Sequence, residues 1–98
     1  LGGTFVKVGV ELVRKLTKQA SLEVIALGSP DDFVQPTVDG MAEQVKLVQG
    51  YVDVATALGA SVVSLKVGTP KEGVSEAEAI NLIIKGLQHV APYARDRR

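Results

Sequence analysis

Three residues able to do acid–base or charge chemistry lie at or after the ends of two apolar segments of this 98-residue chain. Asp31 and Asp32 come after residues 22–27, and Lys66 lies near the end of residues 61–67. Two neighbouring carboxylates could bind a cation or transfer a proton, and a lysine at a strand end could hold an anion or act as a base. A turn and helix-cap role for the aspartates is the alternative that we prefer on the residues alone, because aspartate after proline favours turns.

The segment 61–67 predicts a strand with two unlike faces. Four of its seven residues are Val or Leu, and no helix breaker interrupts it. Alternation places Val63, Leu65 and Val67 on one face, and Val62, Ser64 and Lys66 on the other. A buried parallel strand is normally apolar on both faces. The face with Ser64 and Lys66 therefore lines something wet or functional, or Lys66 simply reaches solvent at a strand end or edge.

Helical and strand patterns alternate along the chain. Residues 22–27 predict a strand before a loop at 28–37, and residues 38–58 carry an apolar stripe at helical spacing that Gly59 ends. Ser75 and Glu78 form a capping-box pattern that begins another helix, which Pro92 should bend or end. We expect a short strand within residues 5–10 and a helix over about 10–18, although a helical stripe also fits the whole stretch.

Composition narrows the classes of function. Eleven basic and eleven acidic residues give no net charge, so no basic field would recruit nucleic acid. No apolar run approaches the roughly 20 residues that cross a bilayer, and we expect no membrane partner. The absence of Cys excludes disulfides and thiolate metal sites and is compatible with the cytoplasm, where we place the protein. A single His, at 89, excludes a monomeric site that needs two imidazoles.

The alternation of strands and helices predicts an α/β fold in one domain, residues 1–98, with two to three parallel strands. A parallel sheet this small leaves long apolar edges, which soluble proteins avoid. The chain therefore looks incomplete by itself. We expect either a homo-oligomer in which copies pair or a part of something larger.

Several stretches of the sequence resemble the xylose-isomerase-like TIM barrels, which include sugar (phosphate) isomerases and epimerases and the apurinic endonucleases. The resemblance covers roughly residues 11–98 and is carried by residues 22–27, 31–36, 52–60, 75–76 and 86–94. It implies a (β/α)₈ barrel with a divalent metal at the carboxyl ends of the strands. Such a barrel takes about 250 residues, so this chain would be a partial (β/α) TIM-barrel-like unit.

The resemblance also bears on the site. The family's metal-binding residues come mostly from later strands, Pro30 stands where many relatives carry His, and Lys66 stands where the endonuclease branch has His. We therefore expect no metal ligand and no cofactor in this chain. The residues placed at the barrel mouth are Asp31, Asp32, Phe33, Ser64 and Lys66.

Three functions follow as alternatives. The first is a self-associating partial barrel without a complete catalytic metal site. The second is an isomerase or epimerase of a small sugar or sugar phosphate, in which Asp31 or Asp32 transfers a proton and Lys66 binds the anionic group. The third is a non-catalytic module that binds a small polar ligand at the same strand ends, with Phe33 and Ser64 contacting the ligand.

Overall fold

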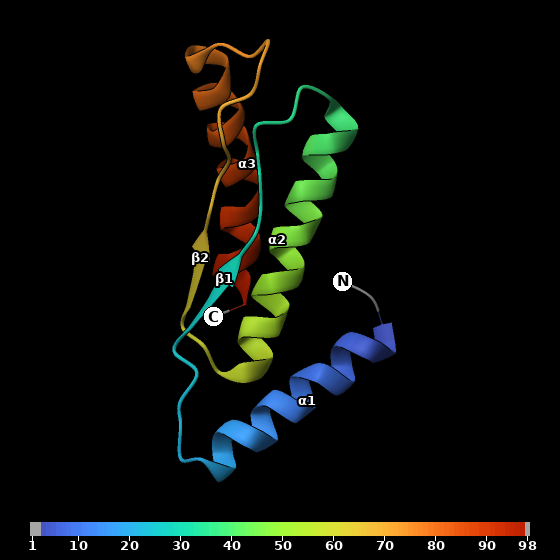
Figure 1. Cartoon of the computed structure of the whole chain (residues 1–98), viewed down its shortest axis with the longest axis vertical. Coiled ribbons are helices and arrows are strands. Elements are labelled where there is room, and N and C mark those ends of the chain that lie inside the picture. Colours follow the sequence, from blue (N-terminus) through green and yellow to red (C-terminus); the bar gives the residue numbers. More distant parts are fainter. Residues whose placement is uncertain (1–2, 98) are drawn as a thin grey trace.

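The structure, a computed structural model, describes residues 3–97 and alternates helices with strands (Figure 1). In chain order the elements are α1 (Gly3–Gln19), β1 (Ala26–Ser29), α2 (Val38–Leu58), β2 (Val62–Leu65) and α3 (Glu76–Asp96). The two strands pair in parallel, with Ala26 opposite Val62 and Ser29 opposite Leu65. The α/β class and the partial β/α organisation are as predicted.

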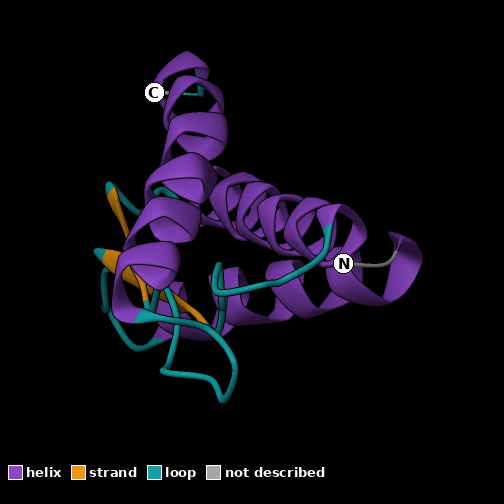
Figure 2. Cartoon of the chain, turned by 90° about the horizontal axis from the view of Figure 1, so that it is seen from above, coloured by secondary structure: helices purple, strands orange, loops and turns teal. Residues whose placement is uncertain are grey.

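Helix α2 is the element on which the others pack. It connects the two parallel strands and contacts both of them, while α3 lies along α2 and α1 crosses near the end of α2 (Figure 1). Figure 2 shows the two strands side by side at one flank of the helices. Within residues 3–97, neither strand has a second neighbour, so the sheet has two open edges.

The core lies between α2, α3 and the loop that follows β1. Its buried apolar residues include Phe33, Val48, Val52 and Val90. Phe33 is 0% exposed, and its ring lies so close to Gly86 of α3 that a Cβ at that position would overlap it. The loop residue Phe33 therefore fixes how closely α3 approaches the rest of the molecule.

The helix ends follow the sequence signals. The hydroxyl of Thr37 accepts a hydrogen bond from the Gly40 N–H at 3.0 Å, and Gly59 ends α2 in the left-handed conformation with φ 74°. The Ser75 hydroxyl accepts from the Glu78 N–H at 3.2 Å to begin α3. The prediction of residues 38–58 as a helix is confirmed at both ends.

Pro92 does not end α3, which continues to Asp96. The turn beyond Pro92 is anchored to α2, because the Tyr93 hydroxyl donates to both carboxylate oxygens of Asp53 at 2.7 and 2.8 Å. Arg97 adds a 3.3 Å ion pair to Asp53 and lies over the Tyr93 ring. These tertiary contacts compensate for the hydrogen bond that proline cannot donate.

The predicted strand within residues 5–10 is wrong, because this stretch belongs to α1. The apolar residues of this stretch recur at helical spacing, and this pattern outweighs the β propensity of its valines. The strand predicted at 22–27 lies later, at Ala26–Ser29, because its register is set by pairing with Val62–Leu65. Along residues 3–97 the helices are too short or too polar to cross a membrane.

Candidate functional site

The carboxyl ends of β1 and β2 carry the polar residues singled out from the sequence. Val63, Leu65 and Val67 pack toward the core, as predicted. Val62, Ser64 and Lys66 are exposed on the other face of the sheet. Ser64 lies opposite Gly28 in the ladder, so no side chain from β1 covers it at that position. The sheet thus has one covered face and one open polar face near its carboxyl end.

Asp31 ties the end of β1 to the end of β2. The residue is 0% exposed, and its two carboxylate oxygens accept hydrogen bonds from the backbone N–H groups of Lys66 and Val67, both at 3.1 Å. A buried carboxylate needs such donors to offset its lost hydration. Asp31 therefore acts as a clamp between the two loops, and both of its oxygens are occupied.

The backbone held by this clamp makes an unusual turn. Val67 has φ 62°, and the Gly68 N–H donates to the Lys66 carbonyl at 2.9 Å. An i to i+2 bond around a residue with positive φ is a γ-turn of the rare, strained kind, and a β-branched residue rarely takes positive φ. The Phe33 N–H holds the turn from the other side by donating to the Val67 carbonyl at 2.7 Å. Strain of this kind persists only where its surroundings enforce it.

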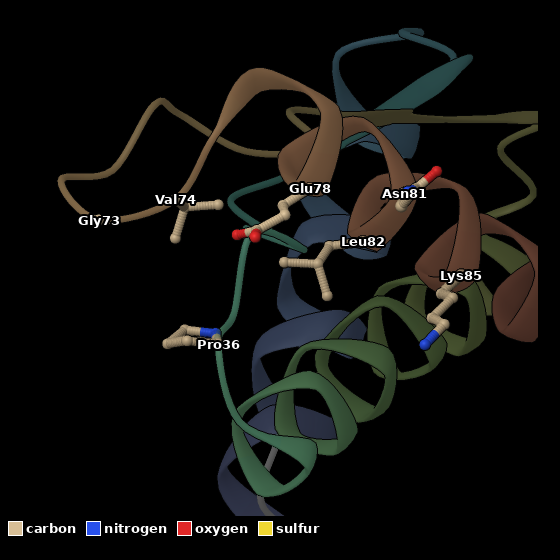
Figure 3. Close-up of a pocket in the computed structure, with 7 residues that line it drawn as sticks. All are labelled: Pro36, Gly73, Val74, Glu78, Asn81, Leu82 and Lys85. Atoms are coloured by element: carbon tan, nitrogen blue, oxygen red, sulfur yellow. The ribbon is translucent and has the colours of Figure 1, made fainter.

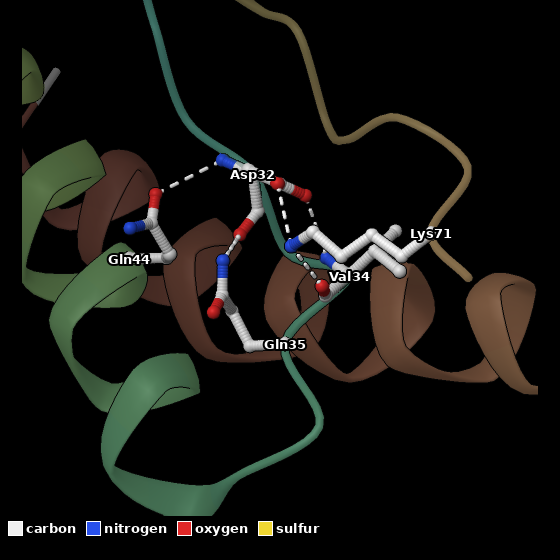
Figure 4. A network of polar contacts seen from close by, with 5 residues as sticks. All are labelled: Asp32, Val34, Gln35, Gln44 and Lys71. Carbon is white, nitrogen blue, oxygen red and sulfur yellow. Dashed lines mark hydrogen bonds and ion pairs between the residues drawn. The ribbon is translucent and has the colours of Figure 1, made fainter. Parts of the chain in front are cut away.

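Asp32 belongs to a second network, centred on an ion pair with Lys71 (Figure 4). One carboxylate oxygen accepts from the Val34 N–H at 3.0 Å, and the other lies 2.7 Å from the Lys71 ammonium, which also donates to the Val34 carbonyl. The Asp32 backbone N–H donates to the Gln44 side chain of α2 at 2.9 Å, and the Gln35 amide donates to the Asp32 carbonyl at 3.0 Å.

The electrostatics of this network keep Asp32 ionised. Burial raises the pKa of its carboxyl group, but the hydrogen bond from Lys71 and the Val34 N–H outweigh burial and bring the pKa below its ordinary value. A carboxylate with a lowered pKa is a weaker base. With the oxygens of Asp31 also engaged, neither aspartate is arranged to accept a proton from a ligand.

The structure separates the five predicted site residues. Phe33 is a core residue, so its ring has no free surface in this chain. Ser64 and Lys66 are exposed, and their side chains make no hydrogen bond or ion pair with the residues that the structure describes. Asp31 accepts from the backbone N–H groups of Lys66 and Val67 and does not contact the Lys66 ammonium, whereas Asp32 pairs with Lys71. No sequence pattern signals the pairing of Asp32 with Lys71, because the two residues are 39 positions apart.

The donor set does not fit the divalent metal that the family resemblance implies. Among the described residues, no group of three His, Asp or Glu side chains converges. The two aspartates nearest the strand ends direct their oxygens at backbone N–H groups and at Lys71.

Comparison with known proteins identifies a fold but no family. The sequence matches no family model and no curated protein. The fold is similar to the crystal structure of protein SMc04130 from Sinorhizobium meliloti 1021, with a TM-score of 0.81 and 22% sequence identity. The match covers 94% of this chain and 34% of that one, so this chain spans about a third of its structural neighbour.

Proposed function

We propose that this chain is a partial barrel that self-associates, so that its sheet continues across chains. The observation that carries the proposal is the two-stranded parallel sheet with both outer edges free among the described residues. Parallel sheets are normally covered on both faces and extended by further strands, and an open edge offers unpaired N–H and C=O groups to another chain.

Exposed apolar side chains support the same proposal. On the open face of the sheet, Val62 is 53% exposed. On α3, Ile80, Ile84 and Leu87 are spaced like one stripe of a helix and are 50%, 45% and 38% exposed. An exposed apolar stripe on α3, together with two free strand edges, is what contact with further β/α structure would cover. The fold similarity covers about a third of a longer protein, which is consistent with a sheet that continues beyond this chain.

Light scattering at several protein concentrations tests the proposal. We expect a mass of at least twice the 10.3 kDa of the chain at micromolar concentration, most simply a two-fold dimer. The associated chain should also be folded, with a helical circular-dichroism spectrum and a cooperative thermal transition. A well-folded monomer at the same concentration contradicts the proposal.

The second candidate function is non-catalytic binding of a small sugar or sugar phosphate at Ser64 and Lys66. The specific observation is that Lys66 is exposed on the open face, while Asp31 and Asp32 are both engaged. A lysine ammonium suits a phosphate as a point charge. An isomerase or epimerase would need a free base at this place, so binding without turnover fits these contacts better.

The location of the protein in the cytoplasm stays a prediction.

Thermal melting with a sugar phosphate tests the binding function. Ligand that binds only the folded chain raises Tm by mass action, and we expect Lys66→Met to abolish this shift while Lys46→Met, at an exposed position on α2, retains it. Equal shifts in both variants exclude Lys66 as the anion-binding group. Conversion of the sugar phosphate by the purified chain would instead support the isomerase alternative.

A further inference from the structure

A separate hollow of about 320 Å³ lies against the first turns of α3 (Figure 3). Two loops form its walls: Pro36 comes from the loop after β1, and Val74 comes from the loop after β2. Leu82 of α3 supplies an apolar surface between them. The volume is at the lower end of the range for small-molecule sites. None of the residues proposed for sugar binding lines this hollow.

Two opposite charges border the hollow without pairing. Glu78 and Lys85 both line it, and Figure 3 shows Leu82 between them. They are seven residues apart on one helix, which separates their Cα atoms by about 10.5 Å along the axis. Neither side chain forms an ion pair within the described part of the chain. The hollow therefore has a negative end, an apolar middle and a positive end.

The orientation of Glu78 departs from the role that its position predicts. In a capping box, the carboxylate at this position returns to the backbone N–H of the N-cap residue. The Ser75 hydroxyl does accept from the Glu78 N–H, but the return bond is not formed, and Figure 3 shows the carboxylate directed into the space between Val74 and Pro36. The carboxylate of Glu78 thus remains available to a ligand.

The walls of the hollow are fixed independently of any ligand. Pro36 follows directly on Gln35, whose amide is bonded to the Asp32 carbonyl. The Val74 N–H donates to the Lys71 carbonyl at 3.2 Å, and Lys71 is itself paired with Asp32. One network therefore holds both loops, and a site whose walls are preorganised loses less free energy on binding.

We propose that this hollow binds a short linear zwitterion, an ω-amino acid with its ammonium at Glu78 and its carboxylate at Lys85. Charge complementarity sets the direction, and Leu82, which lies between the two charged side chains in Figure 3, suits the methylene chain of the ligand. The Cα atoms of the two residues lie about 10.5 Å apart along the helix axis, so a ligand that bonds both side chains needs several methylene groups between its own charges. 4-Aminobutanoate has such a chain, whereas glycine has a single carbon between its charged groups.

A length series tests the proposal on the full chain. Isothermal titration with glycine, 4-aminobutanoate and 8-aminooctanoate measures the length dependence, and butanoate and butylamine each present one charge only. We expect 4-aminobutanoate to bind at least tenfold more tightly than each of the other four. Binding that is independent of length or equally tight for a singly charged probe, or no binding by any member, overturns the proposal.

Matched variants locate the site. Glu78→Gln and Lys85→Met should each weaken 4-aminobutanoate binding at least tenfold. Two substitutions at exposed positions serve as controls, Glu76→Gln in the first turn of α3 and Lys46→Met on α2. Each should leave the affinity for 4-aminobutanoate within twofold of that of the unchanged chain. Circular dichroism confirms that each variant is folded. Unchanged binding in Glu78→Gln or Lys85→Met, or equal loss in the two controls, places any binding elsewhere and contradicts the assignment.

Discussion

At the scale of single residues, the buried carboxylate of Asp31 should contribute strongly to stability. Asp31→Asn replaces one of two accepting oxygens by an N–H₂ group that faces a backbone donor, so the N–H of Lys66 or Val67 loses its partner. We expect the free energy of unfolding to fall by about 2–4 kcal/mol. Urea melts measure this loss, with the exposed Asp39→Asn as the control, expected to cost less than about 1 kcal/mol. Equal losses would contradict the clamp.

Asp32 should make stability depend on pH through Lys71. Because its folded pKa lies below its unfolded value, the stabilisation is complete above about pH 5 and is lost as the pH falls through the folded pKa. Lys71→Met removes the ion pair, whose two side chains are 32% and 28% exposed, so we expect a loss of roughly 1 kcal/mol at pH 7. Urea melts from pH 7 to pH 2.5 should show this difference shrinking below about pH 4. A difference constant over that range would contradict the pairing.

The sequence predicts the local chemistry of these residues but not their distant partners. Aspartate after proline favours a turn, and Asp32 does accept from the Val34 N–H two residues on. The contacts of Asp31 with Lys66 and of Asp32 with Lys71 depend on how the strands are paired, which local patterns do not determine. For the same reason the family resemblance predicts Phe33 at a barrel mouth, whereas its ring fills the core against Gly86.

At the scale of elements, two helical glycines should respond oppositely to alanine. Gly9 in α1 has open space around it, so Gly9→Ala should stabilise the protein by about 1 kcal/mol through helix propensity. A Cβ at Gly86 in α3 would overlap the Phe33 ring, and Gly86→Ala should destabilise by about 1–3 kcal/mol through overpacking. Thermal melts of both variants provide the measurement. Stabilisation by Gly86→Ala would mean that α3 packs less closely on Phe33.

The two faces of β2 provide a second contrast. Val63 packs against the core and Lys66 is exposed. Val63→Ala removes two methyl groups from the packed face and should cost about 1–3 kcal/mol. Lys66→Met should be nearly neutral or stabilising, because a charge with no partner among the described residues adds little. Urea melts compare the two variants. A larger loss for Lys66→Met would contradict this assignment of the two faces.

Element prediction from sequence succeeded where a long pattern and local end signals agree. Val38–Leu58 has a sustained apolar stripe, a Thr37 cap and a terminal Gly59, and the helix forms with those limits. The short apolar stretch at 5–10 fits both a strand and a helix, and only the whole of Gly3–Gln19 resolves it as helical. Strand ends were less certain because they depend on the partner strand.

At the scale of the whole molecule, association along the free edge of β2 should depend on Val62, which is exposed on the open face of that strand. If copies continue the sheet beside β2, Val62 lies at the contact, and Val62→Glu would bring a carboxylate into an apolar interface, which is unfavourable. We expect its self-dissociation constant to rise at least tenfold, measured by sedimentation over a concentration series. The control is Val38→Glu, because Val38 is 86% exposed at the start of α2, where a carboxylate is favourable. An equal rise in both variants would place the contact outside this face, and an unchanged constant for Val62→Glu would show that association does not use the open face of β2.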